Sequence, residues 1–363
     1  MLNLLIALGA LLGAADRVTG NRLKLGDKFE EGFLCMGPTA LSMVGIICLA
    51  PLMGRVCGIV IEPVFGWFGI DPAMFGCILA NNMGGCPLAQ TLAHSREIGL
   101  YSGLIVSSTL GATLVYTIPV ALGLLPARCQ EDFAAGVMIG LVAVPVGSMA
   151  GGVFMGIPFS TLFLNTLPVA LVSALVIGGF ALWKARVIRG FMIFAGGLRI
   201  VTVLSLGAAA FAYISGIPLI PGLEPIEEGL AVVTDMCVVQ LGSIPLAYLF
   251  IYILKRPLSA LGKRLCMDRV SVAAFPISCV NVMSVFMMAK DMDRRGVVVT
   301  AAWYTNSICL FTAHYAYTQS VAPEIVGPMM AAKAVGGILA VTLAYYATRD
   351  MAEGKQALDE TRR

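Results

Sequence analysis

Charge is scarce in this sequence of 363 residues, since only 12% of them are Asp, Glu, Lys or Arg while 58% are hydrophobic. A soluble domain carries about a quarter charged residues. A soluble chain this apolar could not cover its own surface with polar groups, so we expect lipid to solvate much of it. The net charge of +3 is too small to indicate binding of nucleic acid.

Catalytic and metal-binding motifs are missing as well. The chain has only two histidines, and neither forms a recognisable nucleophile–base motif with its neighbours. The ten cysteines stand without a CxxC pair, so neither a zinc site nor a disulfide framework is indicated. No phosphate-binding loop is present. We therefore expect a protein that is not an enzyme and that needs no metal, cofactor or ATP.

Long hydrophobic runs, by contrast, are abundant. A helix needs about 20 apolar residues to cross the hydrocarbon core of a membrane. The N-terminal run is short and lacks a basic flank, so we expect a first helix there rather than a signal peptide. These runs predict an all-α polytopic membrane protein with about nine transmembrane helices. The segments are 1–15, 32–54, 99–125, 133–155, 157–183, 190–215, 229–254, 297–317 and 325–347.

Two further apolar segments, 72–93 and 270–289, carry residues at their centres that disfavour a helix. Asn and Gly are poor helix formers, and Pro interrupts the hydrogen-bond ladder. Non-helical backbone at membrane depth is tolerated only where protein or a wet cavity surrounds it. We therefore expect two broken, re-entrant helical segments. Their central residues are Asn81, Asn82, Gly84 and Gly85 in the first, and Pro276, Ser278 and Asn281 in the second.

The distribution of Lys and Arg among the loops bears on whether these two segments cross the membrane. Basic residues accumulate on the cytoplasmic side. If both segments enter and leave on one side and the N-terminus is outside, nearly all loop Lys and Arg are cytoplasmic, and only Arg55 and Arg96 are external. If both segments cross fully, the basic residues divide almost evenly. The charges therefore favour the re-entrant arrangement.

Short motifs recur in the same order in the two halves of the chain. An odd number of predicted crossings separates the two copies, so the second copy is inverted. Inverted repeats with paired broken helices are typical of secondary transporters, whose substrate site lies at the repeat interface. The matched motifs are 29–32 and 226–229 (with Gly45 and Gly242 in register), 81–83 and 281–283 (with Ala89 and Ala289), and 150–153 and 335–338.

The repeat also predicts how the chain is organised. We expect an N-terminal repeat over 1–156 and a connecting helix over 157–189. A C-terminal repeat with a short cytoplasmic tail follows over 190–363.

Polar and small residues of the broken segments are the first candidates for substrate binding. A break frees backbone carbonyls and amides, Asn side chains add donors and acceptors, and glycine lets a substrate or a facing backbone approach closely. The alternative is that these residues form tight helix–helix contacts. The candidates are Asn81, Asn82, Gly84, Gly85, Ser278 and Asn281.

Ionisable residues inside predicted helices form a second group of candidates. His314 is the only histidine in an apolar segment, and it could bind substrate, relay a proton or satisfy a packing contact. Asp235 could bind a cationic amine, with Gln240 further along the same helix as an auxiliary residue. Arg199 and Lys333 also lie within helices, and Arg199 could instead form a structural pair with Asp235.

Over nearly its whole length the sequence resembles the ethanolamine-utilisation permease family (EutH-like). The resemblance implies a multi-pass protein of the bacterial cytoplasmic (inner) membrane that admits ethanolamine. The stretches that carry it are FEEGFLCMGPTALSMVGIICLAPLM (29–53), MFGCILANNMGGCPLAQTLA (74–93), LYSGLIVSSTLGATLVYTIPVALGLL (100–125), PVGSMAGGV (145–153), LIPGLEPI (219–226) and FMMAKDMDRRG (286–296).

Two positions depart from the pattern of that family. Asn82 stands where an Asp usually precedes Met-Gly-Gly, and Ala313 stands where an Asp usually precedes the histidine. A buried carboxylate would be the natural counter-charge for ethanolamine, which is a cation at neutral pH. Without these two, a neutral amine could be held by Asn82, Asn281 and His314, or Asp235 could supply the counter-charge.

Three functions remain open from the sequence. We expect a permease for a small amine, above all ethanolamine, which works by facilitated diffusion or ion-coupled transport with its site between the repeats. The alternative is an ion-coupled carrier for an amino acid or an organic anion, since half-helix N-termini favour anions. A membrane-embedded enzyme or structural subunit is disfavoured by the missing catalytic motifs. The expected partners are the small-molecule substrate and membrane lipid, and a homo-oligomer is compatible with the sequence.

Overall fold

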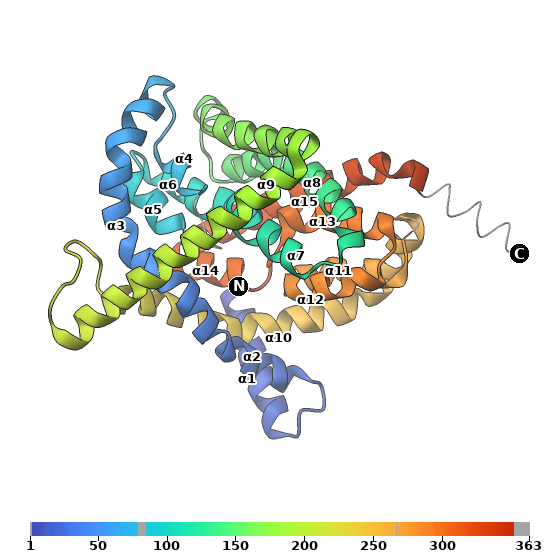
Figure 1. Ribbon diagram of the computed structural model, residues 1–363. Coiled ribbons are helices and arrows are strands. Elements are labelled where there is room, and N and C mark those ends of the chain that lie inside the picture. The colour runs from blue at the N-terminus through green and yellow to red at the C-terminus, as the bar shows by residue number, and fades with distance from the viewer. Residues whose placement is uncertain (1, 79–84, 266, 352–363) are drawn as a thin grey trace, which may run out of the picture.

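The computed structural model describes residues 2–78, 85–265 and 267–351, and the regular structure in these ranges is all helical (Figure 1). Within these described ranges, six helical stretches are long and apolar enough to cross a membrane. The predicted class of an all-α, multi-pass membrane protein is therefore confirmed, while the count of about nine crossings stays a prediction. The six stretches are Leu25–Trp67, Arg96–Leu124, Ala127–Phe154, Phe159–Ser215, Ile226–Ile253 and Pro323–Ala347.

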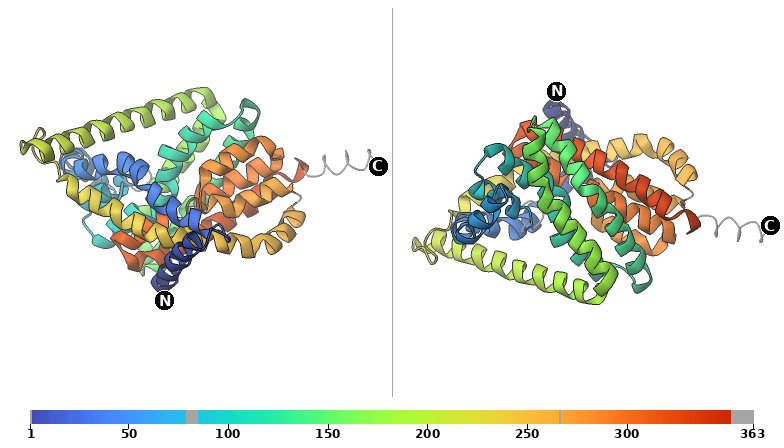
Figure 2. Two further views of the ribbon diagram at one scale, coloured as in Figure 1. Left: turned by 90° about the horizontal axis from the view of Figure 1, so that it is seen from below. Right: turned by 90° about the horizontal axis from the view of Figure 1, so that it is seen from above.

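Two of the predicted segments join in one helix, and another is shorter than a typical crossing. Helix α9 (Phe159–Ser215) runs through both 157–183 and 190–215, and inside it the backbone at Trp183 leaves the helical region, with φ −140° and ψ 46°. Figure 2 shows the two arms of α9 that meet at this kink. The N-terminal helix α1 (Leu2–Val18) has 17 residues.

The segment predicted as one helix over 297–317 is interrupted. Helix α13 (Arg294–Ser307) ends at Ser307, and α14 (Ala313–Val321) begins only at Ala313. Between them Cys309 adopts a left-handed φ of 50°, which is strained for a residue with a side chain. No Gly or Pro lies in this stretch, so the interruption comes from its tertiary surroundings.

Of the two segments with helix-disfavouring centres, the structure describes the centre of the second only, and the helix is interrupted there. In the first, α4 (Ala73–Gly76) is followed by α5 (Gly85–Leu92), and residues 79–84 lie outside the described part of the chain. In the second, α11 (Arg269–Ser278) ends before Cys279 and α12 (Val282–Met288) begins after Asn281. The predicted breaks in 270–289 are thus present, whereas their re-entrant course stays a prediction.

The helical stretch that contains the predicted crossing 99–125 is the most buried of the six apolar stretches. In its most apolar part, 89% of the residues are buried inside the protein. Much of it is π-helix, a wide winding that is rare and often marks functional sites. The order along the chain is α6 (Arg96–Leu100), η1 (Tyr101–Gly111), η2 (Thr113–Thr117) and α7 (Ile118–Leu124), of which η1 and η2 are the π-helical parts.

Glycines allow α8 (Ala127–Phe154), α13 and α15 (Val326–Ala347) to pack closely. A Cβ on Gly147 of α8 would lie 2.7 Å from the carbonyl oxygen of Ala332 and 2.8 Å from the Cα of Gly336, both in α15. A Cβ on Gly336 would in turn lie 2.5 Å from Oδ1 of Asn306 in α13. Small residues at such crossings are the usual means of helix association in lipid.

A second group of close-packed helices consists of α1, α2 (Leu25–Leu34), α3 (Met36–Trp67), α9 and α10 (Ile226–Leu265). Gly242 of α10 packs against the backbone of Ile6 in α1, and Gly45 of α3 packs against the backbone of Thr202 in α9. The two glycines that the repeat places in register therefore both serve as helix contacts.

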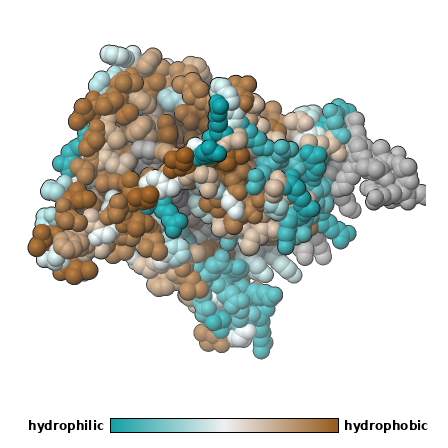
Figure 3. Space-filling model, in the orientation of Figure 1, coloured by the Kyte–Doolittle hydropathy of each residue, from teal (hydrophilic) through white to brown (hydrophobic). Residues whose placement is uncertain are grey.

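The surface agrees with lipid as the solvent. Figure 3 shows apolar side chains over much of one face, while the projection formed by the turn between α1 and α2 is mostly hydrophilic. Large apolar side chains on α9, among them Leu167, Leu171 and Leu175, are exposed. Many of the polar side chains that stay inside the protein lie on η1, α9 and α13.

Candidate functional site

Two interrupted helices meet in the interior and exchange hydrogen bonds across their breaks. The backbone N–H of Cys309 donates to the carbonyl of Ser278 at 3.0 Å, and the N–H of Phe311 donates to the carbonyl of Cys279 at 3.0 Å. The hydroxyl of Thr312 donates to the carbonyl of Val280 at 2.8 Å. Each break therefore satisfies backbone groups of the other, which explains how both persist away from water.

Ser278, a predicted site residue, holds this junction together. Its hydroxyl donates to the carbonyl of Phe275 at 2.7 Å and accepts from Nε1 of Trp303 at 3.1 Å. The indole N–H of Trp303 also lies 3.3 Å from the Phe275 carbonyl. These bonds tie the end of α11 to α13 and fix the position at which α11 stops.

A buried lysine lies directly beside this junction. Nζ of Lys333, in α15, lies 2.7 Å from the carbonyl oxygen of Ser108 in η1 and 3.0 Å from that of Ile308. It lies 2.9 Å from Nδ1 of His314, in the first turn of α14. Lys333 and His314 are both 0% exposed. In the described part of the chain, Lys333 makes no ion pair with a carboxylate.

The π-helical winding contributes to the lysine site. Thr113 of η2 donates its hydroxyl hydrogen bond to the carbonyls of Thr109 and of Thr305, at 2.8 and 3.1 Å, and so ties the π-helix to α13. The hydroxyl of Ser307 donates to the carbonyl of Lys333 at 3.0 Å. The surroundings of the two carbonyls at Nζ are thus tied together by hydrogen bonds, from η2 to α13 and from α13 to α15.

The predicted residues Asn281 and Gly85 lie at the starts of short helices. Oδ1 of Asn281 accepts from the N–H of Met283 at 3.0 Å and so caps α12. Gly85 is buried at the start of α5, and the next residue, Cys86, packs against Gly103 of η1. Asn81, Asn82 and Gly84, the other predicted residues of this segment, lie outside the described residues.

Asp235 and Gln240 lie elsewhere on α10. Asp235 is exposed and lines a groove of about 810 Å³ between α1, α10 and the end of α14. Gln240 is buried where Gly32 of α2 packs against its backbone. Neither residue is hydrogen-bonded to Lys333 or His314. The ion pairs of the described residues also do not include one between Asp235 and Arg199, both of which are exposed.

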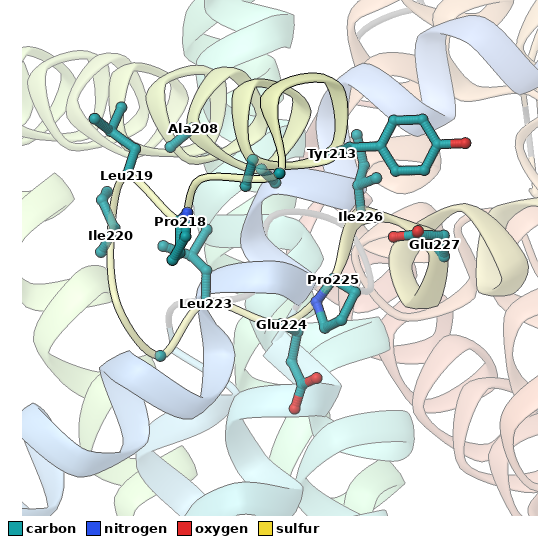
Figure 4. A pocket seen from close by; sticks show the side chains of 14 residues that line it. Ala208, Tyr213, Pro218, Leu219, Ile220, Leu223, Glu224, Pro225, Ile226 and Glu227 are labelled. Carbon is teal, nitrogen blue, oxygen red and sulfur yellow. The ribbon is translucent and has the colours of Figure 1, made fainter.

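Acidic side chains line two cavities at the start of α10. One, of about 460 Å³, lies between the end of α9 and the connection to α10 and includes Glu224 and Glu227 (Figure 4). The other, of about 560 Å³, lies between α3, α5 and α10 and includes Gln90, Glu224 and Glu228. Glu224 therefore borders both cavities.

Lys333 is the residue whose importance the sequence indicated only weakly. A single lysine in the otherwise apolar helix α15 was the available signal. Its partners could not be found in the same way, because two of them are backbone carbonyls. The described residues contain no group of three or more His, Cys, Asp or Glu side chains that are placed to bind a metal ion.

These features define the class as a multi-pass helical membrane protein with interrupted helices around a buried polar centre. The chain belongs to the family described as "Ethanolamine utilisation protein, EutH", whose model matches residues 1–347. This confirms the resemblance that the sequence motifs indicated. No solved structure matches the chain.

Three relatives illustrate the family. The chain is 37% identical to a probable ethanolamine permease EutH of Listeria monocytogenes, over 98% of this chain and 96% of the relative. It is 35% identical to a probable ethanolamine permease EutH of Escherichia coli, over 88% of this chain and 84% of that protein. It is also 34% identical to the uncharacterized protein YxeR of Bacillus subtilis, over 95% and 93%.

Proposed function

We propose that this chain is a permease that carries ethanolamine across the bacterial cytoplasmic membrane. The observation that carries the proposal is the family match over residues 1–347. In addition, the chain is similar to two proteins named as probable ethanolamine permeases, over 96% and 84% of their lengths. An all-helical protein with six long apolar helices and interrupted helices in its interior suits such a task. The lack of catalytic motifs in the sequence is consistent with transport rather than chemistry.

We further propose that transport uses two inverted repeats, and reciprocal contacts support this. Gly32 and Gly229 are equivalent in the predicted repeat, as are Val44 and Leu241, because both pairs are 197 positions apart. A Cβ on Gly32 would lie 2.7 Å from the backbone N of Leu241, and a Cβ on Gly229 would lie 2.8 Å from Val44. A contact that recurs with the partners exchanged is what a two-fold relation between the repeats would produce.

The third repeated motif supports the same relation. Gly151 and Gly336 are 185 positions apart, as are Gly147 and Ala332. A Cβ on Gly147 would lie 2.8 Å from the Cα of Gly336, and a Cβ on Gly151 would lie 2.8 Å from the Cβ of Ala332. The crossing of α8 and α15 is therefore reciprocal too, and it passes beside the buried lysine.

For the substrate site we propose the helix breaks, with Asn281 as a direct contact. Because Oδ1 of Asn281 caps α12, its amide Nδ2 is available to donate a hydrogen bond to the hydroxyl of ethanolamine. Asn81, Asn82, Gly84 and Gly85 would form the matching half of the site. Ser278 and His314 would support it by fixing the breaks and the lysine site, whereas Asp235 and Gln240 lie outside this junction.

The acidic cavities suit an approach route for a cation. Glu224, Glu227 and Glu228 lie where the loop-charge pattern predicts the external side. Carboxylates around a cavity raise the local concentration of a cationic solute. An organic anion would be repelled by them, which disfavours the alternative of an organic-anion carrier.

The test is uptake of labelled ethanolamine by proteoliposomes that contain the purified protein, with and without a pH gradient. We expect saturable uptake at micromolar substrate that unlabelled ethanolamine inhibits and that amino acids and organic acids do not. Uptake no greater than in empty vesicles under all of these conditions would contradict the proposal.

A further inference from the structure

Lys333 has a complete set of hydrogen-bond partners from the chain itself. An ammonium group has three N–H donors and no acceptor. Around Nζ there are three acceptors: the carbonyls of Ser108 and Ile308 and, when its proton is on Nε2, the Nδ1 of His314. One N–H for each acceptor leaves none for a substrate. The lysine is therefore unsuited to bind an anionic ligand in this conformation.

The two carbonyls occupy equivalent places in the proposed repeats. Ser108 and Ile308 are 200 positions apart, as are Asn81 and Asn281 of the matched broken segments. One carbonyl belongs to the π-helix η1 and the other to the break between α13 and α14. Both repeats thus present an oxygen toward the same point, which is how an inverted-repeat protein builds a cation site.

Only one repeat supplies a cation to this point. The counterpart of Lys333, 185 positions earlier in the α8–α15 match, is Ser148 of α8. Ser148 is 0% exposed, and its hydroxyl has no hydrogen-bond partner in the described structure. Each proposed repeat therefore supplies one carbonyl oxygen to the site, whereas only the second repeat supplies an amino group.

A purely structural role does not account for a lysine here. A charge in the interior of a membrane protein is costly, and an apolar residue of similar volume packs as well or better in many cores. The other titratable side chains near Nζ are Cys279 and Cys309, which are weak hydrogen-bonding groups. Backbone carbonyls are also the groups that coordinate free monovalent cations in the filters of ion channels and in ion-coupled transporters.

We propose that Lys333 is a resident ammonium ion in a cation site built by both repeats, and that it replaces a co-transported inorganic cation. The site has the chemistry of an alkylammonium rather than a metal-ion site, because one ligand is an imidazole nitrogen and the distances are those of N–H hydrogen bonds. Transport then needs no sodium, since the charge that sodium would bring is part of the chain. This last statement and the assignment of the two carbonyls to two repeats rest on the proposed function, whereas the contacts of Lys333 do not.

The site is tested by chemical rescue in purified protein. Replacing Lys333 with Ala removes three methylene carbons and the ammonium, which together have the shape of n-propylammonium. We expect Lys333→Ala to lower the thermal midpoint by several degrees and n-propylammonium chloride to restore most of that loss. The uncharged 1-propanol, which has the same length, should not restore it.

Two matched variants separate the cation site from other effects of the amine. Lys333→Met fills the space without a charge, so n-propylammonium should not raise its midpoint beyond the shift that unmodified protein shows. Lys290→Ala removes an exposed lysine and should behave as the unmodified protein. Rescue of Lys333→Ala by 1-propanol as well as by the amine, or by neither, would overturn the proposal.

The sodium statement is tested on the unmodified protein, so it does not depend on a variant that folds. Ethanolamine uptake by proteoliposomes should be the same when sodium is replaced by potassium on both sides, and a sodium gradient should not increase it. Sodium-dependent uptake would refute the replacement of a co-transported ion. If no uptake occurs at all, the proposed function fails, while the thermal-shift experiment still decides whether Lys333 occupies an ammonium site.

Discussion

Individual polar residues in the interior have defined partners, and those partners determine what a substitution removes. Asn281 caps a short helix with one side-chain atom and has a second that is available to a ligand. His314 faces Lys333 rather than solvent. The sequence predicted Asn281, Ser278 and His314 as candidates for substrate binding, because they are polar residues inside apolar runs, and that role stays a prediction. The sequence could not predict Lys333 as their neighbour, because backbone carbonyls carry no sequence signal.

Asn281→Ala is expected to reduce ethanolamine uptake severalfold without loss of membrane expression. The change removes both the cap of α12, which is worth about 1 kcal/mol, and the proposed donor to the substrate. Asn281→Asp keeps a capping oxygen but lacks the N–H donor. Uptake and thermal midpoint are measured for both variants.

If Asn281→Asp has normal stability and reduced uptake, the amide contacts substrate. Uptake equal to the unmodified protein in both variants would mean that Asn281 has no part in transport.

Asp132 and Arg294 form a two-bond ion pair between α8 and α13, with distances of 3.0 and 3.1 Å. Arg294 is largely exposed while Asp132 is nearly buried, so solvent screens the pair and we expect a small, favourable coupling energy. A double-mutant cycle with Asp132→Asn and Arg294→Gln, followed by thermal unfolding in detergent, measures it. Strictly additive effects of the two changes would show that the pair contributes nothing.

At the level of helices, the sequence predicted the apolar helices. It also predicted breaks in the two segments whose centres carry poor helix formers. The break after Ser278 follows from Asn281 and from nearby Pro276. The break over 308–312 was not predicted because SICLFTAH contains neither Gly nor Pro. It forms because its backbone pairs with the other break. The π-helical winding of 101–117 was also not predicted.

The glycines at the α8–α13–α15 crossing should tolerate no side chain. Gly336→Ala would place a Cβ 2.5 Å from Oδ1 of Asn306, and Nδ2 of that same side chain donates to the carbonyl of Gly140 at 3.0 Å. We expect destabilisation of about 1–3 kcal/mol, typical of overpacking, seen as a lower thermal midpoint. Gly327→Ala in the same helix meets nothing within 4 Å and should be neutral or slightly stabilising, since Ala favours a helix. Equal midpoints for the two variants would refute this account of the crossing.

For the molecule as a whole, the sequence predicted a membrane transporter from its hydrophobicity, loop charges and repeated motifs. Reciprocal contacts at Gly32 and Gly229, and again at Gly147 and Gly151, support the division into two inverted halves. What sequence reasoning could not supply is how the proposed halves meet, because that depends on which carbonyls are freed at the breaks. Lys333 lies beside the junction of the two described breaks, and in our proposal its ammonium takes the place of a co-transported cation.

The central claim is that this chain itself moves ethanolamine, and counterflow tests it most directly. Proteoliposomes preloaded with unlabelled ethanolamine are diluted into a trace of labelled ethanolamine at mildly acidic pH, where leakage of the neutral amine is small. The account predicts transient accumulation of label above equilibrium in vesicles with the protein and none in empty vesicles. Label that only equilibrates, at the same rate in both, would contradict it.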